Sequence, residues 1–292
     1  MGMKTYIKRI LKYIVSGVPE KKVYPRVSVI APNDYLKGRV ALITGGTSGI
    51  GFEIAKAYIN AGANVIITGR TKERIDLACS EIDKQVHNKG CIYGLELNNT
   101  DVSQFSKKIE DALKLVFPQK IDILVNNAGV LGAHISNATE DAYDSVLDTN
   151  LKGPFFLSQL IGHYFKDNGI QGNILNIASS SSLRPAASAY TLSKWGIRGL
   201  TIGLAKVLAP YGIVVNGLAP GQTATPMLLS NNSDGNLVSP NTPIGRFILP
   251  EEIANMAVIL VSNMGRSIMG DVVYMTGGAG VFSNEDMDYS FR

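Results

Sequence analysis

Val40-Ala-Leu-Ile43, followed at once by Thr44-Gly-Gly-Thr-Ser-Gly-Ile-Gly51, is the stretch that decides the fold. Four apolar residues before a glycine-rich turn predict a buried strand, and the residues after the turn predict a helix from about 50 to 60. Glycines at such a junction permit a tight turn and let the backbone approach a pyrophosphate, which the positive end of the helix attracts. The stretch therefore predicts a dinucleotide-binding unit.

The same alternation of strand and helix continues through residues 39–280, and no Pro/Ser-rich linker divides it. This pattern is typical of α/β proteins. We therefore predict a single doubly wound Rossmann-type domain over 39–280, with a parallel seven-stranded sheet and helices on both faces. The predicted strands are 40–43, 64–68, 91–95, 121–125, 172–178, 213–216 and 271–276, and the predicted helices lie at about 50–60, 71–87, 101–116, 140–166, 190–210 and 250–263.

The ends of the chain differ from this domain in charge. Residues 1–38 hold eight Lys/Arg and two Asp/Glu, which leaves 20 Lys/Arg and 22 Asp/Glu for the remainder. The main domain therefore gives no reason to expect nucleic-acid binding. Within the basic extension, residues 1–16 show a helical amphipathic pattern, consistent with weak contact with an anionic membrane surface or with packing on the domain or a partner subunit. Residues 281–292 form an acidic, aromatic tail.

Composition limits the other function classes. Cys79 and Cys91 are too few and too far apart for a disulfide framework or a CxxC site, which favours a reducing, cytoplasmic location. No apolar run approaches the ~20 residues that a membrane span needs. His134 and His163 have no other ligand at metal-binding spacing, so we predict no metal site. His134 either lines a pocket or is an ordinary loop residue.

Tyr190 and Lys194 stand four residues apart in a predicted helix, so their side chains share one face. A nearby ammonium group favours phenolate and should lower the tyrosine pKa from its usual value of about 10. Such a tyrosine can exchange protons with a carbinol or a carbonyl. An isolated pair of this kind arises by chance on many helices, but other candidate residues support it: Asn126-Asn-Ala-Gly129, Asn150, Ser179 and Pro220-Gly221.

The TGxxxGxG spacing at 44–51, the NNAG string at 126–129 and the Tyr190–Lys194 pair together resemble the classical short-chain dehydrogenases/reductases, over about 39–280. The resemblance implies an oxidoreductase that acts on a ketone or a secondary alcohol. It also implies a homo-oligomer, a dimer or a tetramer, with helices near 150–166 and 190–210 at an interface.

The resemblance further assigns catalytic roles. Tyr190 would be the general acid/base, assisted by Lys194, Ser179 and Asn150. The active serine lies three residues past Asn176 in the family pattern, which selects Ser179, with Ser180 as the alternative. A non-catalytic dinucleotide-binding sensor or scaffold on the same fold is the competing hypothesis. The complete set of four groups argues against it, since a binding-only protein has little need for all four.

The cofactor preference follows from Gly69 and Arg70, at the end of the second predicted strand. A carboxylate there would bind ribose hydroxyls and repel a 2′-phosphate, whereas a guanidinium suits phosphate. The sequence therefore favours NADP(H) over NAD(H); alternatively, Arg70 is a surface side chain and NAD(H) is used. The implied cofactor-binding residues are Gly45, Thr47, Ser48, Gly49, Ile50, Gly51, Arg70, Thr71, Glu96, Leu97, Asn127, Ala128, Gly129, Tyr190, Lys194, Pro220, Gly221, Thr223 and Thr225.

The segment 226–243 is polar and rich in Asn and Ser. It is predicted to be either a substrate-covering flap or, in its middle part, a disordered surface loop. The substrate pocket would come from this segment and from the stretches near 131–137 and 181–188.

Overall fold

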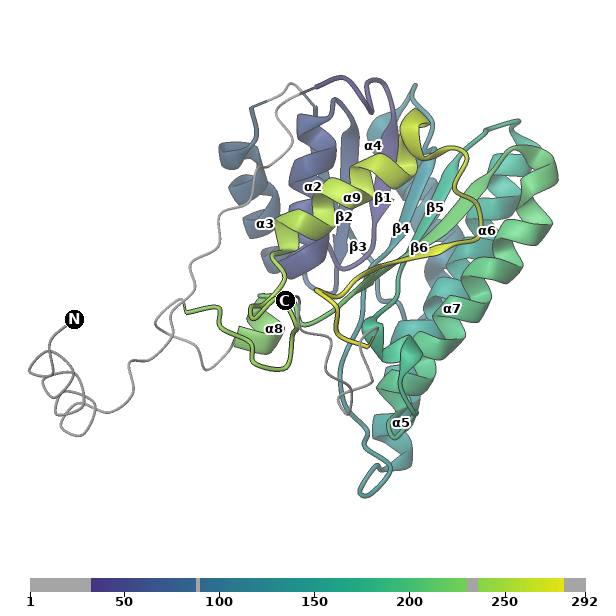
Figure 1. Ribbon diagram of the computed structural model, residues 1–292. Coiled ribbons are helices and arrows are strands. Elements are labelled where there is room, and N and C mark those ends of the chain that lie inside the picture. The colour runs from purple at the N-terminus through teal and green to yellow at the C-terminus, as the bar shows by residue number, and fades with distance from the viewer. Residues whose placement is uncertain (1–32, 88–89, 230–235, 281–292) are drawn as a thin grey trace, which may run out of the picture.

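The computed structural model describes residues 33–87, 90–229 and 236–280. Its strands are β1 Val40–Ile43, β2 Asn64–Gly69, β3 Ile92–Glu96, β4 Ile123–Asn126, β5 Asn173–Ile177, β6 Val214–Pro220 and β7 Val272–Met275. They form one parallel sheet in the order β3-β2-β1-β4-β5-β6-β7 (Figure 1). The predicted doubly wound fold with seven parallel strands is confirmed. The predicted amphipathic stretch 1–16 and the tail 281–292 lie outside the described residues.

Helices cover both faces of the sheet because its inner strands are apolar on both sides. Along β1, Ala41 and Ile43 pack into one core and Val40 and Leu42 into the other. The first core lies under α2 (Gly49–Asn60), α3 (Lys72–Gln85) and α9 (Pro250–Val261), and the second under α4 (Phe105–Val116), α6 (Gly153–Asp167) and α7 (Ala189–Leu208). Two shorter helices, α5 (Glu140–Leu147) and α8 (Pro226–Leu229), follow β4 and β6 along the chain.

The sheet reverses its strand order between β1 and β4. From β1 the chain proceeds to β2 and β3, and from β4 it proceeds the other way to β5, β6 and β7. In open parallel sheets, ligands bind outside the carboxyl ends of the strands at such a switch point. The glycine turn after β1 and the NNAG string after β4 both lie there, and the Thr44 N–H donates to the Val125 carbonyl at 3.0 Å.

Several predicted bounds shift by one or two residues, and two larger differences lie near the site. The single helix predicted for 140–166 is interrupted by a π-helical turn, Asp148–Lys152, between α5 and α6. Asn150 lies in this turn, and its buried side chain bonds to the backbone of Val130, which the wider turn accommodates. The sixth strand was predicted to end at 216 but continues to Pro220, because its last residues pair with β7.

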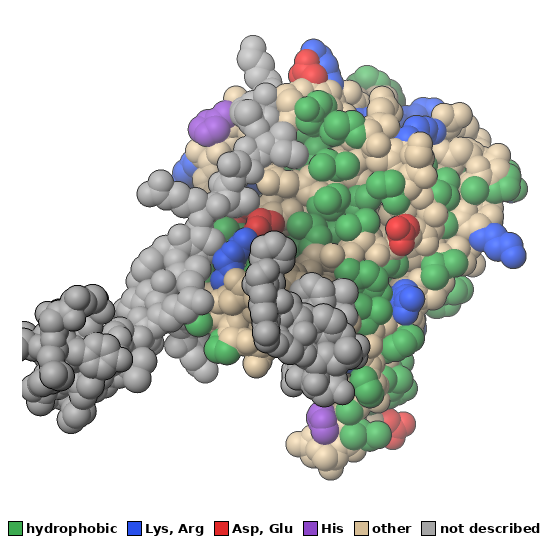
Figure 2. Space-filling model, viewed as in Figure 1, with side chains coloured by type: hydrophobic (Ala, Val, Ile, Leu, Met, Phe, Trp, Pro, Cys, Tyr) green, Lys and Arg blue, Asp and Glu red, His purple; other side chains and the backbone are tan. Residues whose placement is uncertain are grey.

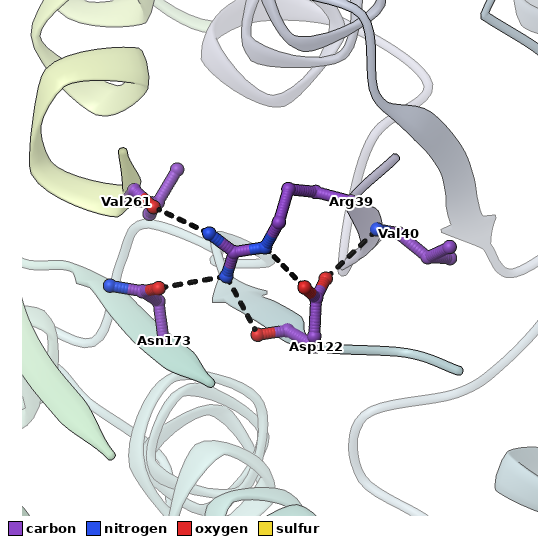
Figure 3. Close-up of polar contacts among 5 residues, drawn as sticks. All are labelled: Arg39, Val40, Asp122, Asn173 and Val261. Atoms are coloured by element: carbon purple, nitrogen blue, oxygen red, sulfur yellow. Dashed lines mark hydrogen bonds and ion pairs between the residues drawn. The ribbon is translucent and has the colours of Figure 1, made fainter. Parts of the chain in front are cut away.

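The amino ends of the strands are joined by a clasp around Arg39 and Asp122 (Figure 3). The two side chains form an ion pair, and Asp122 Oδ1 accepts the Val40 N–H at 2.9 Å. Arg39 also donates to Asn173 Oδ1 at 2.9 Å and to the Val261 carbonyl at 3.2 Å. Burial raises the pKa of Asp122, and the Arg39 charge opposes that shift. The clasp therefore links β1, β4, β5 and the end of α9 at the edge opposite the glycine turn.

We predict that Arg39→Met lowers the free energy of unfolding by about 3 kcal/mol at neutral pH, because it leaves the Asp122 carboxylate largely buried without its cation. The loss should shrink in acid: Asp122 has a raised pKa, so the unpaired charge disappears as the pH falls through that value. Urea unfolding at neutral and acid pH measures both effects. Lys37→Met, which breaks an exposed ion pair with Asp34, is the control and should change little. An equal loss in both variants would contradict the role of the clasp.

Candidate active site

Buried asparagine side chains hold the carboxyl edge of the sheet together. Asn126, the last residue of β4, donates to Asn176 Oδ1 on β5 at 2.8 Å and to Ser158 Oγ on α6 at 2.9 Å. Asn176 in turn donates to Thr201 Oγ1 on α7 at 3.0 Å. All four side chains are buried. The amides therefore fix the ends of β4 and β5 against the two helices that cover them.

The next asparagine fixes the glycine turn. Asn127 Nδ2 donates to the carbonyls of Thr44 and Gly45, both at 2.9 Å. Thr44 Oγ1 accepts the N–H groups of Asn127 at 3.0 Å and Ala128 at 3.1 Å. A Cβ on Gly51 would overlap the Asn127 amide nitrogen and lie 2.5 Å from the Gly45 carbonyl oxygen. The turn and the NNAG string are thus one packed unit in which Gly51 is required by space.

The N-terminus of α2, which follows the glycine turn, has neither a side-chain cap nor an acidic residue in its first turn. Ser48, the N-cap residue, makes no side-chain capping bond, and the first helical turn holds no Asp or Glu. Gly49 adopts φ +59°, a conformation that suits glycine. The Thr225 methyl group lies 3.3 Å from where a Gly49 Cβ would stand, which brings the loop after β6 to the same place. Uncapped N–H groups and close backbone approach fit the pyrophosphate of a dinucleotide.

Three of the predicted catalytic residues meet beyond β5. Ser179, two residues after the end of β5, lies close enough to Tyr190, near the start of α7, to lower the pKa of its hydroxyl. Lys194 Nζ lies 5.7 Å from the centroid of the Tyr190 ring and donates to the Ile177 carbonyl at 2.8 Å. Of the two candidate serines, Ser179 is the one that acts on the Tyr190 pKa.

The expected lowering of the Tyr190 pKa by Lys194 does not hold. Burial raises the pKa of Tyr190, and the hydrogen bond from Ser179 opposes this shift only in part. Burial also lowers the pKa of Lys194 to about 8, so its ammonium group remains mostly charged at neutral pH. The spacing on the helix was predicted correctly, but the prediction neglected desolvation, which here outweighs the attraction between the two groups.

Asn150 connects this centre to the loop after β4. Its Oδ1 accepts the Val130 N–H at 2.8 Å, and its Nδ2 donates to the Val130 carbonyl at 2.9 Å and to Ser193 Oγ at 3.2 Å. Ser193 donates to the Tyr190 carbonyl at 2.6 Å. Asn150 is thus tied to the first turn of α7, which carries Tyr190. Sequence reasoning missed Ser193; its position between Tyr190 and Lys194 was the available signal.

The loop after β6 lies along the other side of the site. The Gly221 N–H donates to the Met275 carbonyl at 2.9 Å, and the Thr223 hydroxyl donates to the Gly221 carbonyl at 3.1 Å. Ser239 Oγ donates to Gln222 Oε1 at 2.5 Å, so the end of the predicted flap is held against this loop. The middle of the flap, 230–235, lies outside the described residues.

The predicted cofactor residues near β3 and β2 differ in burial. Leu97 is buried in the core beneath α4, so a contact with a dinucleotide would be made by its backbone, and its role as a cofactor residue stays a prediction. Strand β3 ends at Glu96, and the side chain of the next residue, Leu97, points into the core. Arg70 and Thr71 are exposed after β2. The sequence also gave no indication of Asn99, whose side chain is buried and whose Nδ2 has no hydrogen-bond partner within the described residues.

His134 is exposed, and its ring nitrogen lies 2.9 Å from Ser136 Oγ. Its backbone pairs with Ser188, two residues before Tyr190, so the loop after β4 packs beside the start of α7. Across residues 33–87, 90–229 and 236–280, no group of three or more His, Cys, Asp or Glu side chains could hold a metal ion. No helix in those ranges is both long and apolar enough to cross a bilayer.

Comparison with known proteins places this site in a family. The model of the short chain dehydrogenase family matches residues 39–236. The 3-oxoacyl-[acyl-carrier-protein] reductase FabG of Aquifex aeolicus (strain VF5) is 35% identical over 248 residues, covering 83% of this chain and 98% of that protein. The chain therefore belongs to the short-chain dehydrogenase/reductase family, as its motifs predicted. It is an oxidoreductase that acts on CH–OH or keto groups.

Solved structures resemble the whole described domain. A 3-ketoacyl-(acyl-carrier-protein) reductase from Brucella melitensis, complexed with NADH, is 29% identical with a TM-score of 0.75, covering 84% of this chain and 99% of that one. A short chain dehydrogenase from Burkholderia cenocepacia J2315, in complex with NADP, is 29% identical with a TM-score of 0.75, covering 85% and 100%. Because the two hold different dinucleotides, the choice between them rests on this chain's own residues.

We predict that Gly51→Ala abolishes dinucleotide binding, because the new methyl group would displace the Asn127 amide that holds the glycine turn. Alanine is favoured over glycine inside a helix, so a loss cannot come from helix propensity. Calorimetric titration with NADPH measures the effect. Gly162→Ala on α6 is the matched control, since its methyl group would meet only Leu208 at ordinary contact distance. Unchanged binding by Gly51→Ala would contradict the packed turn.

Proposed function

We propose that this enzyme transfers a hydride between NADP(H) and a ketone or secondary alcohol at the site formed by Ser179, Tyr190 and Lys194. The observation that carries the proposal is the position of Lys194 Nζ, 5.7 Å from the centroid of the Tyr190 ring, together with Ser179 placed where it lowers the Tyr190 pKa. These groups stand at the sheet edge where the glycine turn fits a dinucleotide. Nothing in the site favours the competing sensor or scaffold hypothesis.

A bound nicotinamide dinucleotide would supply or accept the hydride. Ser179 would donate a hydrogen bond to the substrate oxygen, and Tyr190 would give that oxygen its proton in reduction or take it in oxidation. Since burial raises the Tyr190 pKa, the phenol is protonated at neutral pH and is a ready proton donor. Lys194 would bind the ribose hydroxyls of the nicotinamide half. Asn150 would pass protons toward the loop after β4.

The preference for NADP(H) rests on the end of β2. Gly69 stands where a carboxylate would repel a 2′-phosphate, and Arg70 is exposed beside it with its guanidinium free to turn toward a ligand. Thr47 of the glycine turn packs against the same strand end, since a Cβ on Gly69 would lie 2.8 Å from its methyl group. Arg70 is therefore next to the part of the site that would hold the adenosine half.

We predict that Arg70→Ala weakens NADPH binding by about tenfold or more and leaves NADH binding unchanged, since a hydrogen bond to a charged group contributes about 1.5–3 kcal/mol. Side-by-side calorimetric titrations of the wild type and the variant measure this. Lys84→Ala, at the other end of α3, removes a cation remote from the strand end and is the control. Equal binding of both dinucleotides by the wild type would assign Arg70 to the surface and contradict the preference for NADP(H).

We predict that Tyr190→Phe leaves NADPH binding intact and removes most turnover, by roughly 10²-fold or more, because it removes the proton donor alone. In the wild type, alcohol oxidation should rise with pH toward the raised pKa of Tyr190, since the phenolate is the base. Turnover is measured with a 3-oxoacyl thioester, the substrate class named for the Aquifex relative, and with an apolar and a polyhydroxy ketone. Equal turnover by the variant would end this mechanism.

We also propose that the chain self-associates through α6 and α7. Hydrophobic side chains gather along α7 in Figure 2, and several on the two helices are 38–60% exposed: Phe155, Phe156, Leu192, Trp195, Ile202 and Val207. Burying them against a second copy would remove apolar surface from water. Light scattering of the wild type and of Ile202→Glu would test this.

A cytoplasmic location stays a prediction, as does membrane contact through 1–16, which lies outside the described residues.

A further inference from the structure

A second tyrosine, outside the catalytic set, reaches the serine turn from the last strand of the sheet. Ser182 Oγ donates to the Ser179 carbonyl at 2.8 Å and lies 3.0 Å from the Tyr274 hydroxyl. Because the single hydroxyl proton of Ser182 goes to Ser179, Tyr274 must be the donor in the other bond. The chain of bonds therefore runs from Tyr274 through Ser182 to Ser179. Tyr274 belongs to β7, where it pairs with Ala219 of β6.

These bonds bear directly on the orientation of Ser179. The Ser182 N–H also donates to the Ser179 carbonyl, at 3.0 Å, and the Ser181 N–H donates to Ser179 Oγ at 3.1 Å. With its oxygen accepting from Ser181, Ser179 keeps its own proton for an acceptor in the site. The turn 180–183 is a short 3₁₀ segment, which has little stability of its own. Its shape depends on side-chain bonds, and Ser182 is fully buried.

We propose that Tyr274 and Ser182 position Ser179, so that the last strand of the sheet sets the orientation of the active serine. Both are positioning residues, because neither contacts Tyr190 or the reacting atoms. The inference rests on the proposed function, in which Ser179 donates to the substrate oxygen. When Ser182 Oγ accepts a hydrogen bond from Tyr274, its own hydroxyl group is polarised and donates more strongly to the Ser179 carbonyl. Losing the hydroxyl of either Tyr274 or Ser182 should therefore loosen the same turn.

The test is the kinetics of Tyr274→Phe on whichever ketone of the panel the wild type reduces. We expect kcat to fall 3- to 10-fold, which is about 0.7–1.4 kcal/mol in activation free energy, with NADPH affinity unchanged. Ser182→Ala should cause a similar loss, and the double variant should lose little more, because both changes cut one connection. Tyr58→Phe is the matched control: it removes a buried hydroxyl that bonds to the Ala257 carbonyl, far from the serine turn, and should leave kcat unchanged.

A second readout separates positioning from general loosening of the fold. The hydrogen bond from Ser179 lowers the Tyr190 pKa, so displacing Ser179 should move the pH profile of alcohol oxidation to higher pH. Lys194 lies beside Tyr190 on the same helix, and the backbone of His134 pairs with Ser188 at the start of that helix; neither variant changes these two titratable residues. Ser182→Ala keeps every tyrosine, so ultraviolet titration of tyrosinate, with Tyr190→Phe as reference, measures the same shift without substrate.

The outcomes distinguish the two proposals. Wild-type kcat and pH profile in Tyr274→Phe, together with lost turnover in Ser179→Ala, would overturn the positioning role and leave the proposed function standing. Full turnover in Ser179→Ala and Tyr190→Phe would overturn the proposed function itself. If the wild type reduces no ketone of the panel, the ultraviolet titration decides the positioning role alone: an unshifted Tyr190 in Ser182→Ala contradicts it, and an upward shift supports it.

Discussion

The active site depends on the hydrogen bond between Asn126 and Asn176, which joins the carboxyl ends of β4 and β5. The Nδ2 donors of both buried amides also find partners on the covering helices, Ser158 on α6 and Thr201 on α7, whereas Asn126 Oδ1 has no partner within the described residues. The bond therefore sets the distance between the NNAG string, which holds the glycine turn, and α7, which carries Tyr190 and Lys194. One buried polar network therefore places both the glycine turn and the residues that we propose to transfer protons.

Burial then decides the electrostatics of the site. Lys194 is buried and Tyr190 is partly buried, so each charged form is disfavoured, and their pKa values move in opposite directions. Lys194 compensates by donating to the Ile177 carbonyl. The result is a neutral phenol beside an ammonium group at neutral pH. This combination suits a proton donor for a carbonyl oxygen, and it makes the hydrogen bond from Ser179 the principal local influence that stabilises the phenolate.

Sequence patterns predicted the sheet, because it follows from hydrophobic periodicity. The motifs predicted the family, and the resemblance to it implied that Ser179, Tyr190 and Lys194 act together. These patterns did not predict the π-helical turn at Asn150, since it is imposed by side-chain bonds to Val130, a residue distant in sequence. The inward orientation of Leu97 was missed because one residue of register decides which way a side chain at a strand end points. The raised pKa of Tyr190 was missed because burial cannot be derived from spacing on a helix.

The most direct measurement of the central claim is the fate of a label in the reduction of a ketone. NADPH carrying deuterium on the transferred position of the nicotinamide is incubated with the enzyme and the ketone, and the alcohol is analysed by mass spectrometry. The account predicts deuterium on the carbinol carbon. An alcohol with only solvent-derived hydrogen on that carbon would contradict hydride transfer at this site.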